Sequence, residues 1–188
     1  MTNTTTITAA VFTDEVLARA AELARDSYRP VWTGGSGEES TGESVARHLE
    51  ATSALLAADG WARTYPSPTS ASGSTVLPAI ETMSIKDMLI EVLSVIRDEI
   101  ATASAPRTLP MALEHVAHGE DGDGDTRYVA SEVLTLLVRA LTRQDQAAAT
   151  PWAERLHRTH QDVTALLTAG ARFARTYGPG AAQAQHAA

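Results

Sequence analysis

Residues 84–103 read SIKDMLIEVLSVIRDEIATA, and they decide the fold that the sequence predicts. Apolar residues recur there at the spacing that places side chains on one face of an α-helix. Further apolar residues widen this stripe, so the helix needs neighbours on more than one side. Ser84 suits the N-cap position, and Pro106 ends the pattern because proline disrupts helical hydrogen bonding. The segment is predicted to be a buried central helix, whose core-facing stripe contains Ile85, Met88, Leu89, Val92, Ile96 and Ile100.

A second strongly apolar helical pattern covers residues 126–143 and is the natural packing partner of the first. No run alternates apolar and polar residues as a half-buried β-strand would. The sequence therefore predicts an all-α fold. We expect an orthogonal or irregular bundle of five to six helices around two central apolar helices. The inward stripe of the second pattern contains Val129, Val133, Leu136, Leu137 and Leu141.

The other helical patterns belong to a single domain, which is predicted over residues 13–177. Loops are expected at 30–43 and 62–81, where Gly, Pro, Ser and Thr accumulate. The Thr-rich residues 1–12 and the Ala- and Gly-rich residues 178–188 are predicted to be disordered tails. The remaining helices are expected near residues 13–28, 43–59, 110–118 and 159–177.

The composition restricts the chemistry and the compartment. The chain has no cysteine, which excludes disulfides, thiolate metal sites and cysteine nucleophiles. No segment approaches the roughly 20 apolar residues that cross a bilayer, and MTNTTTITAA does not resemble a signal peptide. We therefore expect a cytoplasmic protein with no membrane partner.

The charge distribution disfavours a nucleic-acid partner but does not exclude one. The net charge of −8 opposes contact with phosphate backbones. Residues 126–188, however, contain seven arginines against four acidic residues. A nucleic-acid-associated protein with an Arg-rich C-terminal half is therefore kept as an alternative, acting through Arg139, Arg143, Arg155, Arg158, Arg172 and Arg175.

Two His-x-x-His pairs are candidate metal ligands: His115 with His118, and His157 with His160. Residues three apart share a helix face, so each pair could offer two imidazoles to one divalent ion. The competing interpretation is that these histidines lie near helix ends, where they interact with the dipole or form hydrogen bonds. A metal-dependent helical-bundle enzyme is accordingly an alternative hypothesis, and otherwise no cofactor is expected.

The acidic stretch DGDGDTRYVASE at residues 121–132 has carboxylates at positions used by an EF-hand calcium loop. These are Asp121, Asp123, Asp125 and Glu132. Thr126 occupies the position where the loop needs glycine for a sharp turn. The favoured interpretation is that Asp125 or Thr126 caps the following helix.

Two blocks carry a family resemblance: DGW at residues 59–61 and PWAERLHRTHQDVTALLTAGARFA at residues 151–174. They resemble an uncharacterised helical family of actinobacteria and their phages. Its members close an early helix with Gly-Trp and place a tryptophan shortly before a final helix. The sequence departs from the family's Trp-Asn-Asp pattern, because Ala153 and Glu154 follow Trp152. The resemblance implies an all-helical cytoplasmic domain and assigns no activity.

The leading functional hypothesis is a small accessory or regulatory protein that acts through protein contacts or self-association. No nucleophile motif or phosphate-binding glycine loop is present in the sequence, so catalysis is not indicated. Trp32, Trp61 and Trp152 lie in or beside predicted loops, where aromatic side chains often anchor partners. The competing interpretation is that these tryptophans cover the core.

Overall fold

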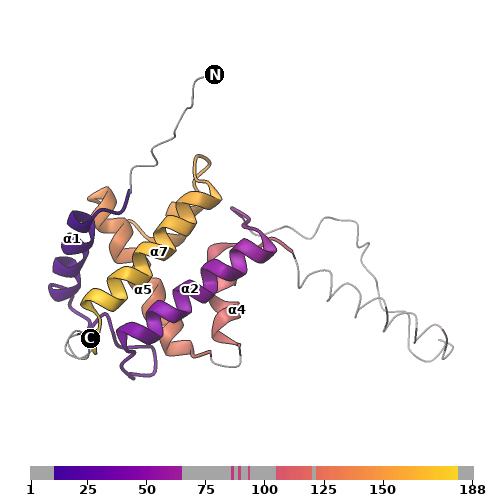
Figure 1. The fold of residues 1–188 in the computed structure, drawn as a ribbon, viewed down its shortest axis with the longest axis horizontal. Coiled ribbons are helices and arrows are strands. Elements are labelled where there is room, and N and C mark those ends of the chain that lie inside the picture. Colours follow the sequence, from indigo (N-terminus) through magenta and orange to yellow (C-terminus); the bar gives the residue numbers. More distant parts are fainter. Residues whose placement is uncertain are drawn as a thin grey trace, which may run out of the picture.

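The computed structural model describes residues 11–64, 86, 89, 93, 105–119 and 122–181. Over these residues the chain forms helices and, outside them, two isolated β-bridges; no β-strand is present in this part of the chain. The all-α fold class predicted from the sequence is confirmed. The helices, shown in Figure 1, are α1 (Asp14–Arg25), α2 (Gly42–Asp59), α4 (Leu109–Ala117), α5 (Gly124–Thr142), α6 (Ala149–Ala153) and α7 (His160–Tyr177).

Local sequence signals explain where most helices begin. Five N-cap residues adopt extended backbone conformations, and each side-chain oxygen accepts a hydrogen bond from a backbone N–H of the first helical turn. Such caps satisfy N–H groups that the helix leaves unpaired, and each is worth about 1 kcal/mol. The five residues are Thr13, Thr41, Thr108, Asp123 and Thr159.

Helix α5 is the centre of the described body. It packs against α1, α2, α4, α6 and α7, and ten of its side chains are buried. Helices α2 and α7 lie side by side across it, as Figure 1 shows. They run antiparallel: Gly42 at the start of α2 donates to Pro179 O at 2.9 Å, whereas Arg63 beyond its end donates to Arg158 O at 3.1 Å.

Gly170 lies where α7 meets both α2 and α5. A Cβ atom at this position would lie 2.8 Å from Leu134 Cδ2 and 2.9 Å from Leu49 Cδ1. These distances are shorter than normal carbon contacts. The glycine therefore lets three helices approach closely, which outweighs its low helix propensity.

The helix predicted over residues 84–103 lies mostly outside the described residues. Lys86, Leu89 and Leu93 are described, and all three are helical and exposed. The exposed fraction is 61% for Leu89 and 56% for Leu93. The prediction that Leu89 faces the core was therefore wrong. In the described body, α1, α2 and α7 are the main neighbours of α5.

The predicted loops and tails contribute contacts to the body. In the 30–43 loop, a β-bridge joins Thr33 to Glu39, and Ser36 N donates to Asp125 Oδ1 at 2.9 Å. Of the 62–81 loop, only residues 62–64 are described. Phe12, assigned to the N-terminal tail, is 5% exposed, and Pro179, assigned to the C-terminal tail, accepts the hydrogen bond from Gly42. None of the described helices has the length and apolar character that crossing a membrane requires.

Candidate functional site

A groove runs along the outer side of the α2–α7 pair. Its cavity measures about 580 Å³. Both helices turn residues at i, i+3, i+4 and i+7 spacing toward it, so each contributes one continuous stripe. Leu49 and Leu167 are buried beneath, and the small residues on the stripes are Ser53, Ala54, Ala57, Thr168 and Ala171.

Arg175 closes one end of this groove and ties α7 to α2. Its Nε atom donates to Glu43 Oε2 at 2.9 Å, and its guanidinium group also donates to both carboxylate oxygens of Glu50. Hydrogen bonds from Arg175 lower the pKa of both glutamates, and the two carboxylates raise the pKa of Arg175. All three side chains are at least two-fifths exposed, so solvent screens much of this attraction.

A second cavity, a cleft of about 710 Å³, lies between α2, α4 and the start of α5. His48, His115 and Asp123 line it, together with Arg47. His48 is only 6% exposed, and its Nε2 atom is buried without a hydrogen-bond partner. A buried, unpaired imidazole nitrogen is a costly feature that a ligand or water could relieve.

The environment of His48 favours the neutral imidazole. Burial lowers its pKa most, because the charged ring loses hydration. Arg127 lowers the pKa further, whereas the Leu113 main chain and the carboxylate of Asp123 oppose the shift. His48 is therefore uncharged at neutral pH, and the ring can both donate and accept hydrogen bonds.

The acidic residues considered for calcium have other roles here. Asp123 caps α5 and accepts hydrogen bonds from Thr126 N and Thr126 Oγ1, each at 2.7 Å; these bonds lower the pKa of Asp123. Asp125 accepts from the backbone and hydroxyl of Ser36, which lowers its pKa. Because α5 already begins at Gly124, the described part of this stretch does not form an EF-hand loop. Glu132 lies within α5, and Asp121 is outside the described residues.

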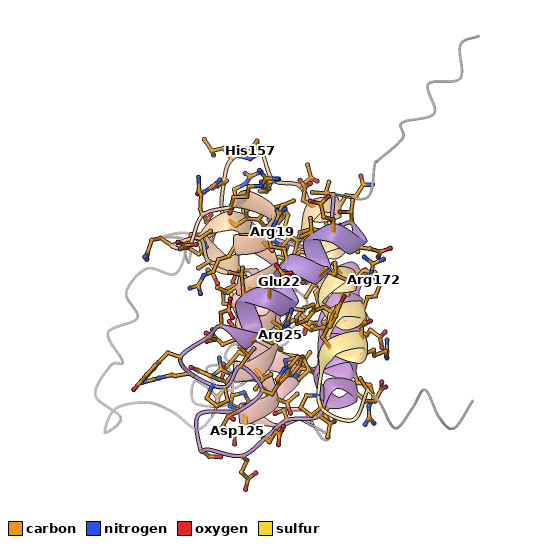
Figure 2. The ribbon with its side chains drawn as sticks, turned by 90° about the vertical axis from the view of Figure 1, so that its left-hand side faces the viewer. Arg19, Glu22, Arg25, Asp125, His157 and Arg172 are labelled. Atoms are coloured by element: carbon orange, nitrogen blue, oxygen red, sulfur yellow. The ribbon has the colours of Figure 1, made fainter. Side chains whose placement is uncertain are left out.

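The four candidate histidines are divided between two ends of the molecule. His115 lines the cleft, and exposed His118 has its Nδ1 atom 2.9 Å from Glu114 O. Exposed His157 and half-buried His160 flank Thr159, which caps α7. Figure 2 shows His157 at the end of the molecule opposite Asp125. The two pairs are not brought together, and no group of three His, Asp or Glu side chains suited to a metal ion occurs among the described residues.

The three tryptophans differ in exposure. Trp152 is only 1% exposed and packs edge-on against Phe12, with 6.2 Å between ring centroids. Its assignment as a surface anchor therefore needs correction, since it is a core residue. Trp32 is half-buried and stacks on Phe173 at 6.1 Å. Trp61 is also half-buried and packs against the core.

Most of the arginines proposed to contact nucleic acid are engaged within the protein. Arg172 pairs with Asp14 at 3.3 Å, Arg175 with the two glutamates of α2, and Arg139 donates to Ala147 O at 3.1 Å. Arg143 forms the left-handed C-cap of α5. The guanidinium groups of Arg139, Arg172 and Arg175 therefore already have acceptors within the protein.

The sequence did not single out the α2–α7 groove or His48. The groove depends on which helices become neighbours, and no local pattern specifies this. His48 lies at a polar position of the α2 pattern and becomes buried only because α4 and α5 cover it. A weak signal was available for the groove, since small residues recur at helical spacing in both α2 and α7.

The described residues form an all-helical domain with a groove and a cleft on its surface. A family model described as "Family of unknown function (DUF6197)" matches residues 40–173, so the chain belongs to that family. This confirms the resemblance to an uncharacterised domain family. No curated protein and no solved structure gave a significant match to the chain.

Proposed function

We propose that this protein is a small cytoplasmic interaction module that self-associates, one copy placing its exposed leucine pair into the α2–α7 groove of a second copy. The observation that carries this proposal is the pair itself. Leu89 and Leu93 are four residues apart in a helix, so their side chains project from one face, and both are mostly exposed. Burying one leucine side chain is worth about 1.5–3 kcal/mol, so this face is a strong candidate contact.

The groove is lined by small side chains, which a docking helix needs for close approach. Its small side chains, including Ala54, Ala57 and Ala171, allow a third helix to approach α2 and α7 closely. Amphipathic helices bind such grooves through apolar anchors at i and i+4. Leu89 and Leu93 have this spacing.

A second copy is the simplest occupant because one chain carries both complementary surfaces. In the single chain, the leucine pair is exposed and the groove is open. A twofold dimer covers each groove with the leucine pair of the other copy, and both contacts are equivalent by symmetry. The dimer therefore needs no further component.

The base of the leucine-bearing segment is fixed to the body. Ala62 N donates to Arg107 O at 2.8 Å, Arg107 N donates to Gly60 O at 3.0 Å, and Arg107 pairs with Asp59 at 2.7 Å. The chain leaving α2 and the chain entering α4 therefore lie side by side. The described residues at the two ends of the segment that carries the leucine pair therefore meet beyond the end of α2.

Light scattering during size-exclusion chromatography tests this proposal. The native chain should elute with twice its mass of 19.9 kDa, and Leu89→Asp with Leu93→Asp should give the monomer mass. Leu156→Asp is the matched control, because Leu156 is 88% exposed but lies outside both surfaces. A native protein that stays monomeric at high micromolar concentration would refute the proposal, as would a double variant that remains dimeric.

A second candidate function, binding of a small polar ligand in the cleft, is favoured by the unpaired Nε2 atom of His48. A ligand with an amide or hydroxyl group could pair with this nitrogen. Ligand-detected NMR with small amides and alcohols tests the idea. Binding that is lost in His48→Leu would support it, and binding that persists unchanged would count against the site.

A further inference from the structure

Arg63 and Arg158 lie together, and Arg158 directly follows His157, which Figure 2 shows at one end of the molecule. Arg63 follows the end of α2, and Arg158 lies in the turn between α6 and α7. One Nη2 N–H of Arg63 donates to Arg158 O at 3.1 Å. The Arg158 guanidinium lies 4.0 Å from the centroid of the Trp152 ring, and that of Arg63 lies 5.7 Å from the Trp61 ring. Both cations are therefore held by aromatic rings, which fixes their positions.

The polar groups of this cluster lack acceptors. The Nε atoms of Arg63 and Arg158 and the Nε1 atom of Trp152 are buried without hydrogen-bond partners, as is the Nε2 atom of His160. Trp152 itself is 1% exposed. Arginine and tryptophan side chains only donate hydrogen bonds, so the missing partner is an acceptor. Several unpaired donors in one place are unusual, because each costs free energy when water is excluded.

No carboxylate in the part of the chain that the structure describes contacts the two arginines of the cluster directly. Among the described residues, the ion pairs with carboxylates involve other cations and neither Arg63 nor Arg158. Asp162 is the acidic group near Arg158, but its Oδ2 atom accepts hydrogen bonds from Thr159 N and Thr159 Oγ1. Desolvation lowers the pKa of Arg158 most, Asp162 raises it, and the neighbouring Arg155 lowers it.

The position of the cluster adds a favourable electrostatic field. His160 is the first residue of α7, an 18-residue helix whose N-terminus is the positive end of its dipole. Backbone N–H groups at such an end bind anions readily. Two guanidinium groups beside it supply planar donors that match phosphate and carboxylate oxygens.

We propose that Arg63 and Arg158 form a binding site for the phosphate group of a ligand, beside the N-terminus of α7. A phosphate supplies both the negative charge and the several acceptor oxygens that the cluster lacks. The site is separate from the α2–α7 groove and independent of self-association. A phosphorylated small molecule or a nucleic-acid backbone could supply the group, and the net charge of −8 favours the small molecule.

NMR titration with inorganic phosphate at constant ionic strength tests this site. The arginine Nε–H resonances of Arg63 and Arg158 and the indole resonance of Trp152 should shift saturably. Affinity should fall about tenfold or more in Arg63→Gln and in Arg158→Gln, because hydrogen bonds to charged groups are worth about 1.5–3 kcal/mol each. Arg25→Gln and Arg172→Gln are the matched controls, because neither side chain belongs to the cluster, and both variants should retain the affinity within about twofold.

Two additional measurements distinguish the possible outcomes. Arg158→Lys keeps the charge and should bind more weakly than the native protein but more tightly than Arg158→Gln, and thermal unfolding monitors the integrity of each variant. A single-stranded oligonucleotide forms the second titration arm. Oligonucleotide binding that needs the same two arginines, and weakens steeply with salt, would support phosphate recognition and assign nucleic acid as its source. Shifts that stay linear with phosphate concentration, or that persist in a folded Arg63→Gln and Arg158→Gln double variant, would overturn the proposal.

Discussion

Replacing Gly170 by alanine tests how closely α2, α5 and α7 are packed. On an exposed helix surface this substitution would stabilise the protein by about 1 kcal/mol through helix propensity. Here the new methyl group would lie 2.8 Å from Leu134 Cδ2 and 2.9 Å from Leu49 Cδ1. Both leucines are fully buried, so neither can turn toward solvent. Overpacking of this kind costs about 1–3 kcal/mol, and we expect a net destabilisation of about 1 kcal/mol.

Urea denaturation followed by circular dichroism measures this change in the free energy of unfolding. Ala18→Gly provides the control, because position 18 is exposed within α1, lies outside both cavities and should show only the propensity difference. Gly170→Ala should become less destabilising, or stabilising, in a Leu134→Ala background, where the conflicting methyl group is removed. If Gly170→Ala instead stabilises the native protein as much as alanine does over glycine at position 18, the three-helix contact is wrong.

Three further substitutions or deletions test other parts of the structure. Arg175→Gln should lower the free energy of unfolding by about 0.5–1 kcal/mol in urea titrations at low salt, and by less in 1 M NaCl; an effect that does not change with salt would contradict an ionic contribution. The lowered pKa of His48 means that the unfolded state binds protons more readily than the folded state. The contribution of His48 to stability is therefore retained above about pH 6.5 and declines as the pH falls below this value. Between about pH 7 and about pH 5.5, the melting temperature of His48→Leu should decrease by less than that of the native protein. An equal decrease in melting temperature for both proteins would show that His48 does not cause the pH dependence. Replacing residues 66–104 with a short Gly-Ser linker should leave the body folded, because Arg107 already holds the two ends of that segment together. A near-UV circular dichroism spectrum without fixed tertiary structure would contradict this expectation.

The features predicted correctly from the sequence are the local ones. Thr13 and Thr159 mark the starts of α1 and α7 in the sequence. An N-cap can be predicted locally because its side chain binds backbone N–H groups only two or three residues later. The apolar stripe of α5 is likewise visible in the sequence, since Val129, Val133 and Leu137 recur with the helical period and are all fully buried.

The features that were missed depend on the neighbours of each helix. Leu89 and Trp152 are both large and apolar, yet one is mostly exposed and the other is buried. Gly170 has a low helix propensity, but its lack of a side chain allows the contact with α2 and α5. His48 is polar and buried because two other helices close over it. In each case tertiary packing, which periodicity does not encode, determines the role of the residue.

Disulfide trapping between two single-cysteine variants tests most directly whether the leucine pair of one copy occupies the groove of another. The chain has no cysteine, so Leu89→Cys and Ala54→Cys each introduce one defined thiol. When the two variants are mixed and oxidised, we predict a disulfide-linked heterodimer that forms faster than either homodimer and faster than the pairing of Leu89→Cys with Leu156→Cys. Heterodimers that form no faster than this control pair, or a rapid link within one chain when both substitutions are combined, would contradict the proposed contact between copies.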